Sequence, residues 1–233
     1  MKIFYHESFK LIKDKQVRVV FLALCFQTIF GFLLSVNRDD FFHTTPAFFL
    51  ENNSDPAVLF ILMGFVSASI FGADFSYRTY KNLVPFVGKR KIFINKMITL
   101  FTSIAGILMI DITLNIAIAF VMTGKIANFL DIISLFKRYF AFYIIIIFLS
   151  AFLILCCILT QNRALTYVMA VALPLLFSAL PVGYNHYTVW DIFEKMYMWN
   201  ANPLNITTVI FIIIISIILL ISEIIFSKRE VLL

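Results

Sequence analysis

Asp111 and Asn115 lie together inside a long apolar stretch, which makes them the first candidates for chemistry in this chain. They are four residues apart, so a helix would carry both on one face. An aspartate at the centre of a membrane helix costs about 2.5 to 3.5 kcal/mol, so we expect it to face other helices or a wet cavity, paired or protonated. It could form a hydrogen bond to a neighbouring helix, or it could line a path for a cationic or amphipathic substrate. Polar residues in other apolar stretches are candidate partners, namely Gln27, Thr28, Ser67 and Ser69, and Gln27 is also a candidate for the substrate path.

Residue patterns of known catalytic sites are missing from the sequence. It contains no phosphate-binding G-x-x-x-x-G-K-[ST] loop, no H-E-x-x-H motif and no paired-glutamate motif. The histidines fall in three separate segments without the spacing of metal ligands, and the cysteines lie in apolar runs, where they behave as small hydrophobic residues. We therefore expect a protein that is not an enzyme and that binds no metal or cofactor itself.

The composition indicates that the chain folds in a lipid bilayer. It has 233 residues, of which 62% are hydrophobic and only 14% charged. The apolar runs are continuous rather than alternating, which predicts helices that pair their own backbone groups in hydrocarbon. We expect one all-α domain over residues 1–233 with six transmembrane helices, at about 17–36, 57–73, 98–123, 138–160, 164–182 and 206–226.

The lysines and arginines predict the orientation of these spans. If both termini lie in the cytoplasm, 14 of the 19 basic residues fall on the cytoplasmic side and five on the outer side. Cytoplasmic segments carry the excess of basic residues in membrane proteins. The net charge of +6 is thus explained by the inner membrane face, and nucleic acid is not an expected partner.

Two segments are predicted to lie on the membrane. A helix over residues 3–14 would place Phe4 and Phe9 on its apolar side and lysines on the other, so it could anchor the chain to anionic lipid or also pack beside a cytoplasmic partner. The outer segment 183–205 contains both tryptophans, Trp190 and Trp199, and a short helix in it would dip an aromatic face into the lipid. An aromatic belt and an outer gate are both compatible with that segment.

The segment 74–96, between the second and third spans, combines basic and apolar residues. It contains six basic residues, the apolar side chains Tyr80, Leu83 and Val84, and a break at 85–88. Two short helices on either side of that break would fit the pattern. Because a solvated loop needs no apolar positions, we expect this segment to be buried against a cytoplasmic protein.

The same segment resembles a known family. Asp74, the run Arg78-Thr79-Tyr80-Lys81-Asn82-Leu83 and the basic residues up to Lys96 are similar to the pattern of type-2 permease subunits of ATP-binding-cassette (ABC) exporters, although Arg78 stands where glycine is usual. The N-terminal elbow helix, the six spans and the outer segment before the last span also match. The resemblance implies a coupling helix that contacts the ATPase, with the contact residues Asp74, Arg78, Thr79, Tyr80, Lys81, Asn82 and Leu83.

The resemblance further implies a function and partners. The chain would be a permease subunit that exports hydrophobic or amphipathic substrates, with ATP and magnesium bound by a separate cytoplasmic ATPase. Six spans would form half of a pathway, so a homodimer or a heterodimer with a second permease is expected. Small size and a bias toward Phe, Ile, Lys and Asn look most like Gram-positive plasma-membrane permeases that export bacteriocins or phenol-soluble modulins or confer immunity to them. The alternative is a proton-coupled secondary transporter using Asp111, although the sequence shows no inverted repeat.

Overall fold

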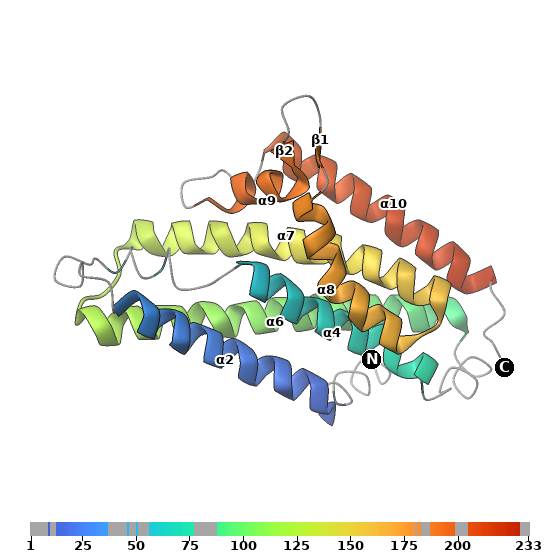
Figure 1. The fold of residues 1–233 in the computed structure, drawn as a ribbon, viewed down its shortest axis with the longest axis horizontal. Coiled ribbons are helices and arrows are strands. Elements are labelled where there is room, and N and C mark those ends of the chain that lie inside the picture. The colour runs from blue at the N-terminus through green and yellow to red at the C-terminus, as the bar shows by residue number, and fades with distance from the viewer. Residues whose placement is uncertain are drawn as a thin grey trace.

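The fold was obtained as a computed structural model that describes residues 9, 13–36, 46, 50, 56–76, 88–179, 181–182, 187–198 and 205–228. This part of the chain forms seven helices and one short hairpin (Figure 1). The helices are α2 (Lys15–Val36), α4 (Pro56–Ser76), α6 (Lys89–Thr123), α7 (Phe129–Thr160), α8 (Arg163–Ala179), α9 (Val189–Tyr197) and α10 (Ile206–Lys228). The hairpin pairs β1 (Pro181–Val182) with β2 (Tyr187–Thr188) in antiparallel register.

Each of the six apolar stretches expected from the sequence falls on a helix, namely α2, α4, α6, α7, α8 and α10. Among the described residues, three stretches are long and apolar enough to cross a membrane by length and composition, at Lys89–Val121, Phe129–Thr160 and Ile206–Lys228. Pro56–Gly72 and Arg163–Ala179 are shorter apolar helices. The all-helical membrane class therefore holds for the described residues, and the arrangement of six spans stays a prediction.

Helix α7 lies at the centre of the bundle. It packs against α4, α6, α8, α9 and α10, whereas α2 packs against α4 and α6. In Figure 1 the long helices α6 and α7 run side by side, with α2 beyond α6 and with α9 and α10 beyond α7, while α8 crosses α7 in the view and packs against α4. Helix α7 buries residues around much of its circumference, while α10 and α6 expose long apolar faces that suit contact with lipid.

The α6–α7 hairpin is longer than a bilayer is thick. Helix α6 has 35 residues, which corresponds to about 52 Å at 1.5 Å per residue, against about 30 Å of hydrocarbon. Figure 1 shows the hairpin turn extending beyond the nearer ends of α4, α8 and α10. Gly124 makes the turn possible, because its φ of 61° caps α6 in the left-handed conformation that glycine adopts at little cost.

The start of α6 differs from the sequence prediction. Residues 89–96 were expected to form a separate short helix before a third span at 98–123, but they are the first two turns of the continuous helix α6. Gly88 precedes the helix with a φ of 79°, so the break in the chain comes before Lys89. Nothing between Gly88 and the apolar part of α6 interrupts the backbone hydrogen bonds, so the two segments merge.

Helix α9 also differs from the prediction in what its aromatic face contacts. Phe193 is fully buried and its ring packs against those of Phe60, Phe148 and Phe211, which belong to α4, α7 and α10. Trp190 is half-buried, with its ring 5.6 Å from that of Phe60. The aromatic face that was expected to dip into lipid therefore packs largely on the helical bundle. Of the other interfacial candidates, Phe9 is exposed, whereas Phe4 and Trp199 lie outside the described residues.

Candidate functional site

Asp111 lies at the centre of a buried network of hydrogen bonds. The hydroxyl of Thr28 donates to Oδ1 of Asp111 at 3.0 Å, and the hydroxyl of Tyr139 donates to Oδ2 at 2.6 Å. Asn115 donates from Nδ2 both to the Tyr139 hydroxyl at 2.8 Å and to the Asp111 backbone carbonyl at 2.9 Å. These four residues, which we call the Asp111 network, are all buried, so α2, α6 and α7 are joined by polar contacts inside the bundle.

The Asp111 network includes only some of the residues expected from the sequence. The structure brings Thr28 and Asn115 to Asp111, as the sequence allowed. The other serine candidates pair elsewhere, since Ser67 contacts the Ser150 hydroxyl at 2.7 Å and Ser69 contacts the Tyr167 hydroxyl at 2.9 Å. Gln27 is half-buried and directly precedes Thr28 in α2. Tyr139 was missed, because no sequence spacing relates it to a residue on another helix.

Arg138 is a second buried charge near the start of α7. The sequence placed it at the outer edge of a span, yet it is only 8% exposed. Its guanidinium carbon lies 5.3 Å from the centroid of the Phe142 ring and 5.9 Å from that of Tyr197. Because the faces of aromatic rings attract cations, these two rings offset part of the free energy that the guanidinium of Arg138 loses on leaving water.

The predicted ATPase-contact segment connects the end of α4 to the start of α6. Arg78, Thr79, Tyr80, Lys81, Asn82 and Leu83 lie outside the described residues. Asp74 lies in the last turn of α4, where only its backbone is described. The contact itself therefore stays a prediction, but the helices on both sides of it are placed.

Those two helices are tied to each other and to α10 by basic residues. Lys96 is 1% exposed, and its ammonium group donates to the carbonyl oxygen of Ile70 in α4 at 2.6 Å. Nε of Arg90 lies 2.6 Å from Oε1 of Glu223 in α10. Lys96 and Arg90 belong to the segment 74–96, which was expected to lie between the second and third spans. These two contacts therefore link α6 to both α4 and α10.

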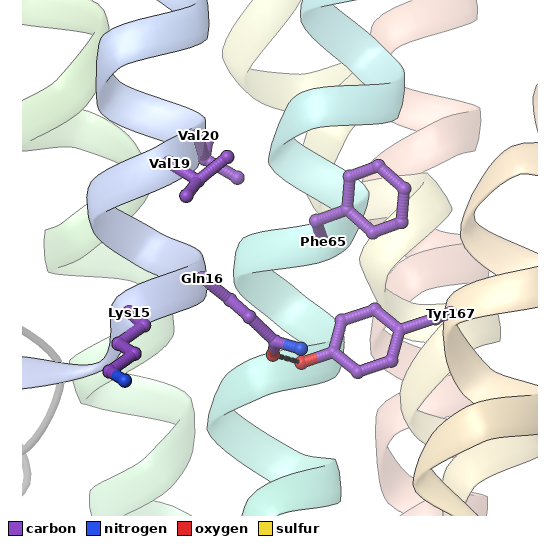
Figure 2. Close-up of a pocket in the computed structure, with 6 residues that line it drawn as sticks. All are labelled: Lys15, Gln16, Val19, Val20, Phe65 and Tyr167. Atoms are coloured by element: carbon purple, nitrogen blue, oxygen red, sulfur yellow. Dashed lines mark hydrogen bonds between the residues drawn. The ribbon is translucent and has the colours of Figure 1, made fainter.

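The start of α2 is held by a separate cluster of polar residues. Gln16 accepts hydrogen bonds from the Tyr167 hydroxyl and from Arg163, both in α8, as Figure 2 shows for the Tyr167 bond. Arg163 also lies 3.4 Å from Oδ2 of Asp14. Ser69 of α4 contacts the same tyrosine, so α2, α4 and α8 meet here.

Asp191 and Thr188 stabilise the start of α9, a helix that lies outside the six spans expected from the sequence. Thr188 caps the helix, since its side chain accepts from the Asp191 N–H while the Asp191 carboxylate accepts from the Thr188 N–H. Hydrogen bonds from the Thr188 backbone and hydroxyl lower the pKa of Asp191 below its usual value. This capping box fixes the first turn of α9 against the hairpin.

The family comparison covers most of these elements. A family model described as ABC-2 family transporter protein matches residues 3–180, which include α2, α4, α6, α7 and α8. No curated protein matches the chain. Membership in this family makes the chain a membrane permease component and implies partnership with ABC ATPase subunits. Because the match extends over more than half of the sequence, the chain belongs to the ABC-2 transporter family.

Proposed function

We propose that this protein is the permease subunit of an exporter that moves hydrophobic or amphipathic substrates, among them membrane-active peptides, out of the cell. The energy would come from ATP hydrolysed by a separate cytoplasmic subunit, which also binds the magnesium. The observation that carries the proposal is the family match over residues 3–180. The six-span topology with cytoplasmic termini, in the plasma membrane of a Gram-positive bacterium, belongs to this proposal, as does assembly with a second identical or related permease.

The placed helices support a mechanical route for this function. The ATPase would press on the coupling segment that includes Lys81 and Leu83. Lys96 and Ile70 join α6 to α4 next to that segment, while Arg90 and Glu223 join α6 to α10. Nucleotide binding would draw two ATPase subunits together, and the joined helices would move as a unit to alternate access to the pathway.

The Asp111 network supports a positioning role for Asp111 in the permease. Both carboxylate oxygens of Asp111 accept hydrogen bonds, and its side chain is buried between α2, α6 and α7. If Asp111, Asn115 and Gln27 line a substrate path, the hydroxyls of Thr28 and Tyr139 must first move away. Membership in the ABC-2 family does not favour the alternative of a proton-coupled secondary transporter.

The proposal is tested by reconstituting the permease with its ATPase in vesicles. The measured quantities are the ATPase rate and the transport of a fluorescently labelled amphipathic helical peptide. We expect Lys81→Glu and Leu83→Glu to uncouple hydrolysis from transport while leaving membrane insertion intact. Lys125→Glu, in the turn between α6 and α7, is the control for charge reversal and should transport normally.

Two results would contradict the proposal. Transport that continues after all nucleotide is removed would contradict an ATP-driven permease. Loss of transport in Asp111→Asn with ATP present, together with normal coupling in Lys81→Glu, would favour proton exchange through Asp111.

A further inference from the structure

Helix α2 contacts the rest of the bundle through a narrow ridge. Val20, Leu24 and Thr28 are buried, and they follow one another at intervals of four residues. Their neighbours Val19 and Leu22 are 63% and 67% exposed. A helix held by a single ridge leaves a groove along each side.

The first groove runs between α2, α4 and α8 at the cytoplasmic end of α2. It has a volume of about 320 Å³ and is lined by Lys15, Gln16, Val19, Val20, Phe65 and Tyr167. Figure 2 shows Gln16 reaching across to Tyr167, with Val19 and Val20 facing Phe65 further along the helix. The contact between Gln16 and Tyr167 lies near the end of the groove where α2 begins, and the side chains further along it, Val19, Val20 and Phe65, are apolar.

The charge at the end of this groove is positive. Lys15 is the charged residue among its described lining residues, and it is exposed. Arg163 lies near Gln16, but Asp14 faces its guanidinium at 3.4 Å and offsets that charge. Lys13 and Arg18 stand close to Lys15 in the sequence and add further positive charge at the same level.

The second groove, on the other side of α2, also combines one charged residue with apolar walls. It has a volume of about 450 Å³ and is lined by Val17, Arg18, Phe21, Leu22 and Ile107. Here Arg18 is the charged residue among the described lining residues, and the remaining walls are apolar. Each groove thus offers one cation near the end where α2 begins and mainly apolar walls along the surface of the bundle.

From this layout we infer that the two grooves beside α2 bind anionic phospholipids of the cytoplasmic leaflet. Lys15 would hold the headgroup phosphate in the first groove, with an acyl chain along Val19, Val20 and Phe65, and Arg18 would do the same in the second. An apolar chain joined to a negative headgroup is the ligand whose chemistry matches both parts of each groove. The inference goes beyond the proposed transport function and rests on its cytoplasmic placement of the α2 N-terminus.

The experiment uses the full chain, purified in detergent, stripped of lipid and titrated with phosphatidylglycerol or phosphatidylcholine while native mass spectrometry counts bound lipids. We expect phosphatidylglycerol to bind more tightly. Lys15→Gln should weaken its binding about fivefold, as expected for loss of one basic contact, and leave phosphatidylcholine binding unchanged. Lys91→Gln is the matched control, because Lys91 is an exposed basic residue at the start of α6 that lies outside both grooves.

A second variant tests the apolar part of the first groove without changing charge. Val19→Trp should fill the channel and reduce the number of bound lipids of either kind, and the exposed position of Val19 makes the substitution compatible with folding. Equal affinity for the two lipids would overturn the inference. Equal losses in Lys15→Gln and Lys91→Gln would also overturn it, because they would indicate diffuse surface charge. These measurements need no ATPase, so they are independent of the test of transport.

Discussion

The hydroxyl of Tyr139 in α7 donates a hydrogen bond of 2.6 Å to Oδ2 of Asp111 in α6, at a place where both side chains are buried. Thr28 supplies the other donor, from α2. A membrane carboxylate held in this way connects three helices, and removing either donor leaves part of it without a partner. Removal of either donor should therefore lower the free energy of unfolding of the bundle.

Tyr139→Phe should lower the free energy of unfolding by about 1 kcal/mol, because a buried acceptor loses its donor while the ring is retained. Asp111→Asn, which keeps an acceptor oxygen, should cost less than Asp111→Ala. The measurement is equilibrium unfolding in mixed detergent micelles. Tyr143→Phe, one turn along α7 and outside the Asp111 network, is the control, and an equal loss in both tyrosine variants would contradict the assignment.

Gly64 in α4 lies close to Ala170 in α8. A Cβ atom added at Gly64 would lie 3.1 Å from Cβ of Ala170 and 3.4 Å from its carbonyl oxygen. Gly64→Leu should therefore force the helices apart and lower the free energy of unfolding by about 1 to 3 kcal/mol. In the same unfolding assay, Gly106→Leu should be neutral or stabilising, since a Cβ at Gly106 meets nothing within 4 Å among the described residues. Similar losses at both glycines would show that helix packing does not explain the effect.

Arg90 and Glu223 hold the start of α6 against the end of α10. The pair is partly exposed, so its contribution to stability should not exceed about 1 kcal/mol. Arg90→Glu should increase hydrogen exchange at the end of α10, because two carboxylates then face each other. The double variant Arg90→Glu with Glu223→Arg should restore protection from exchange at the end of α10. The control Lys91→Glu should leave exchange there as slow as in the unmodified protein. A double variant no better protected than Arg90→Glu would contradict a direct contact.

Asp191 should make the start of α9 sensitive to acid. Its folded pKa is lowered by hydrogen bonds from Thr188, so the capping interaction is fully present above the ordinary aspartate pKa of about 3.9 and is lost as the pH falls through the folded value. The protection of α9 amides, taken as the exchange rate relative to the intrinsic rate at each pH, should therefore stay high from neutral pH to about pH 5 and fall below about pH 4. Thr188→Ala should raise exchange even at neutral pH, while Thr188→Ser should preserve the acid dependence. Acid dependence that survives in Thr188→Ala would assign it to another group.

Local composition was enough to predict the class of this protein. Continuous apolar stretches gave six helices at the expected places, because backbone groups in hydrocarbon must be paired within their own segment. The resemblance of residues 74–96 to permease subunits agrees with the family match over residues 3–180. The apolar stretches and the family resemblance are each read from neighbouring residues along the chain. Neither prediction therefore requires knowledge of which helices contact one another.

Contacts between distant residues were decided by the tertiary structure alone. Asp111 could have bonded to any of several polar residues, and only the packing of α2, α6 and α7 selects Thr28 and Tyr139. Lys96 and Arg138 looked like surface charges in the sequence, yet helix packing buries both, with a backbone carbonyl near one and aromatic rings near the other. Hydropathy measures whether a segment enters the membrane, but the direction in which a side chain points within the bundle depends on the neighbouring helices.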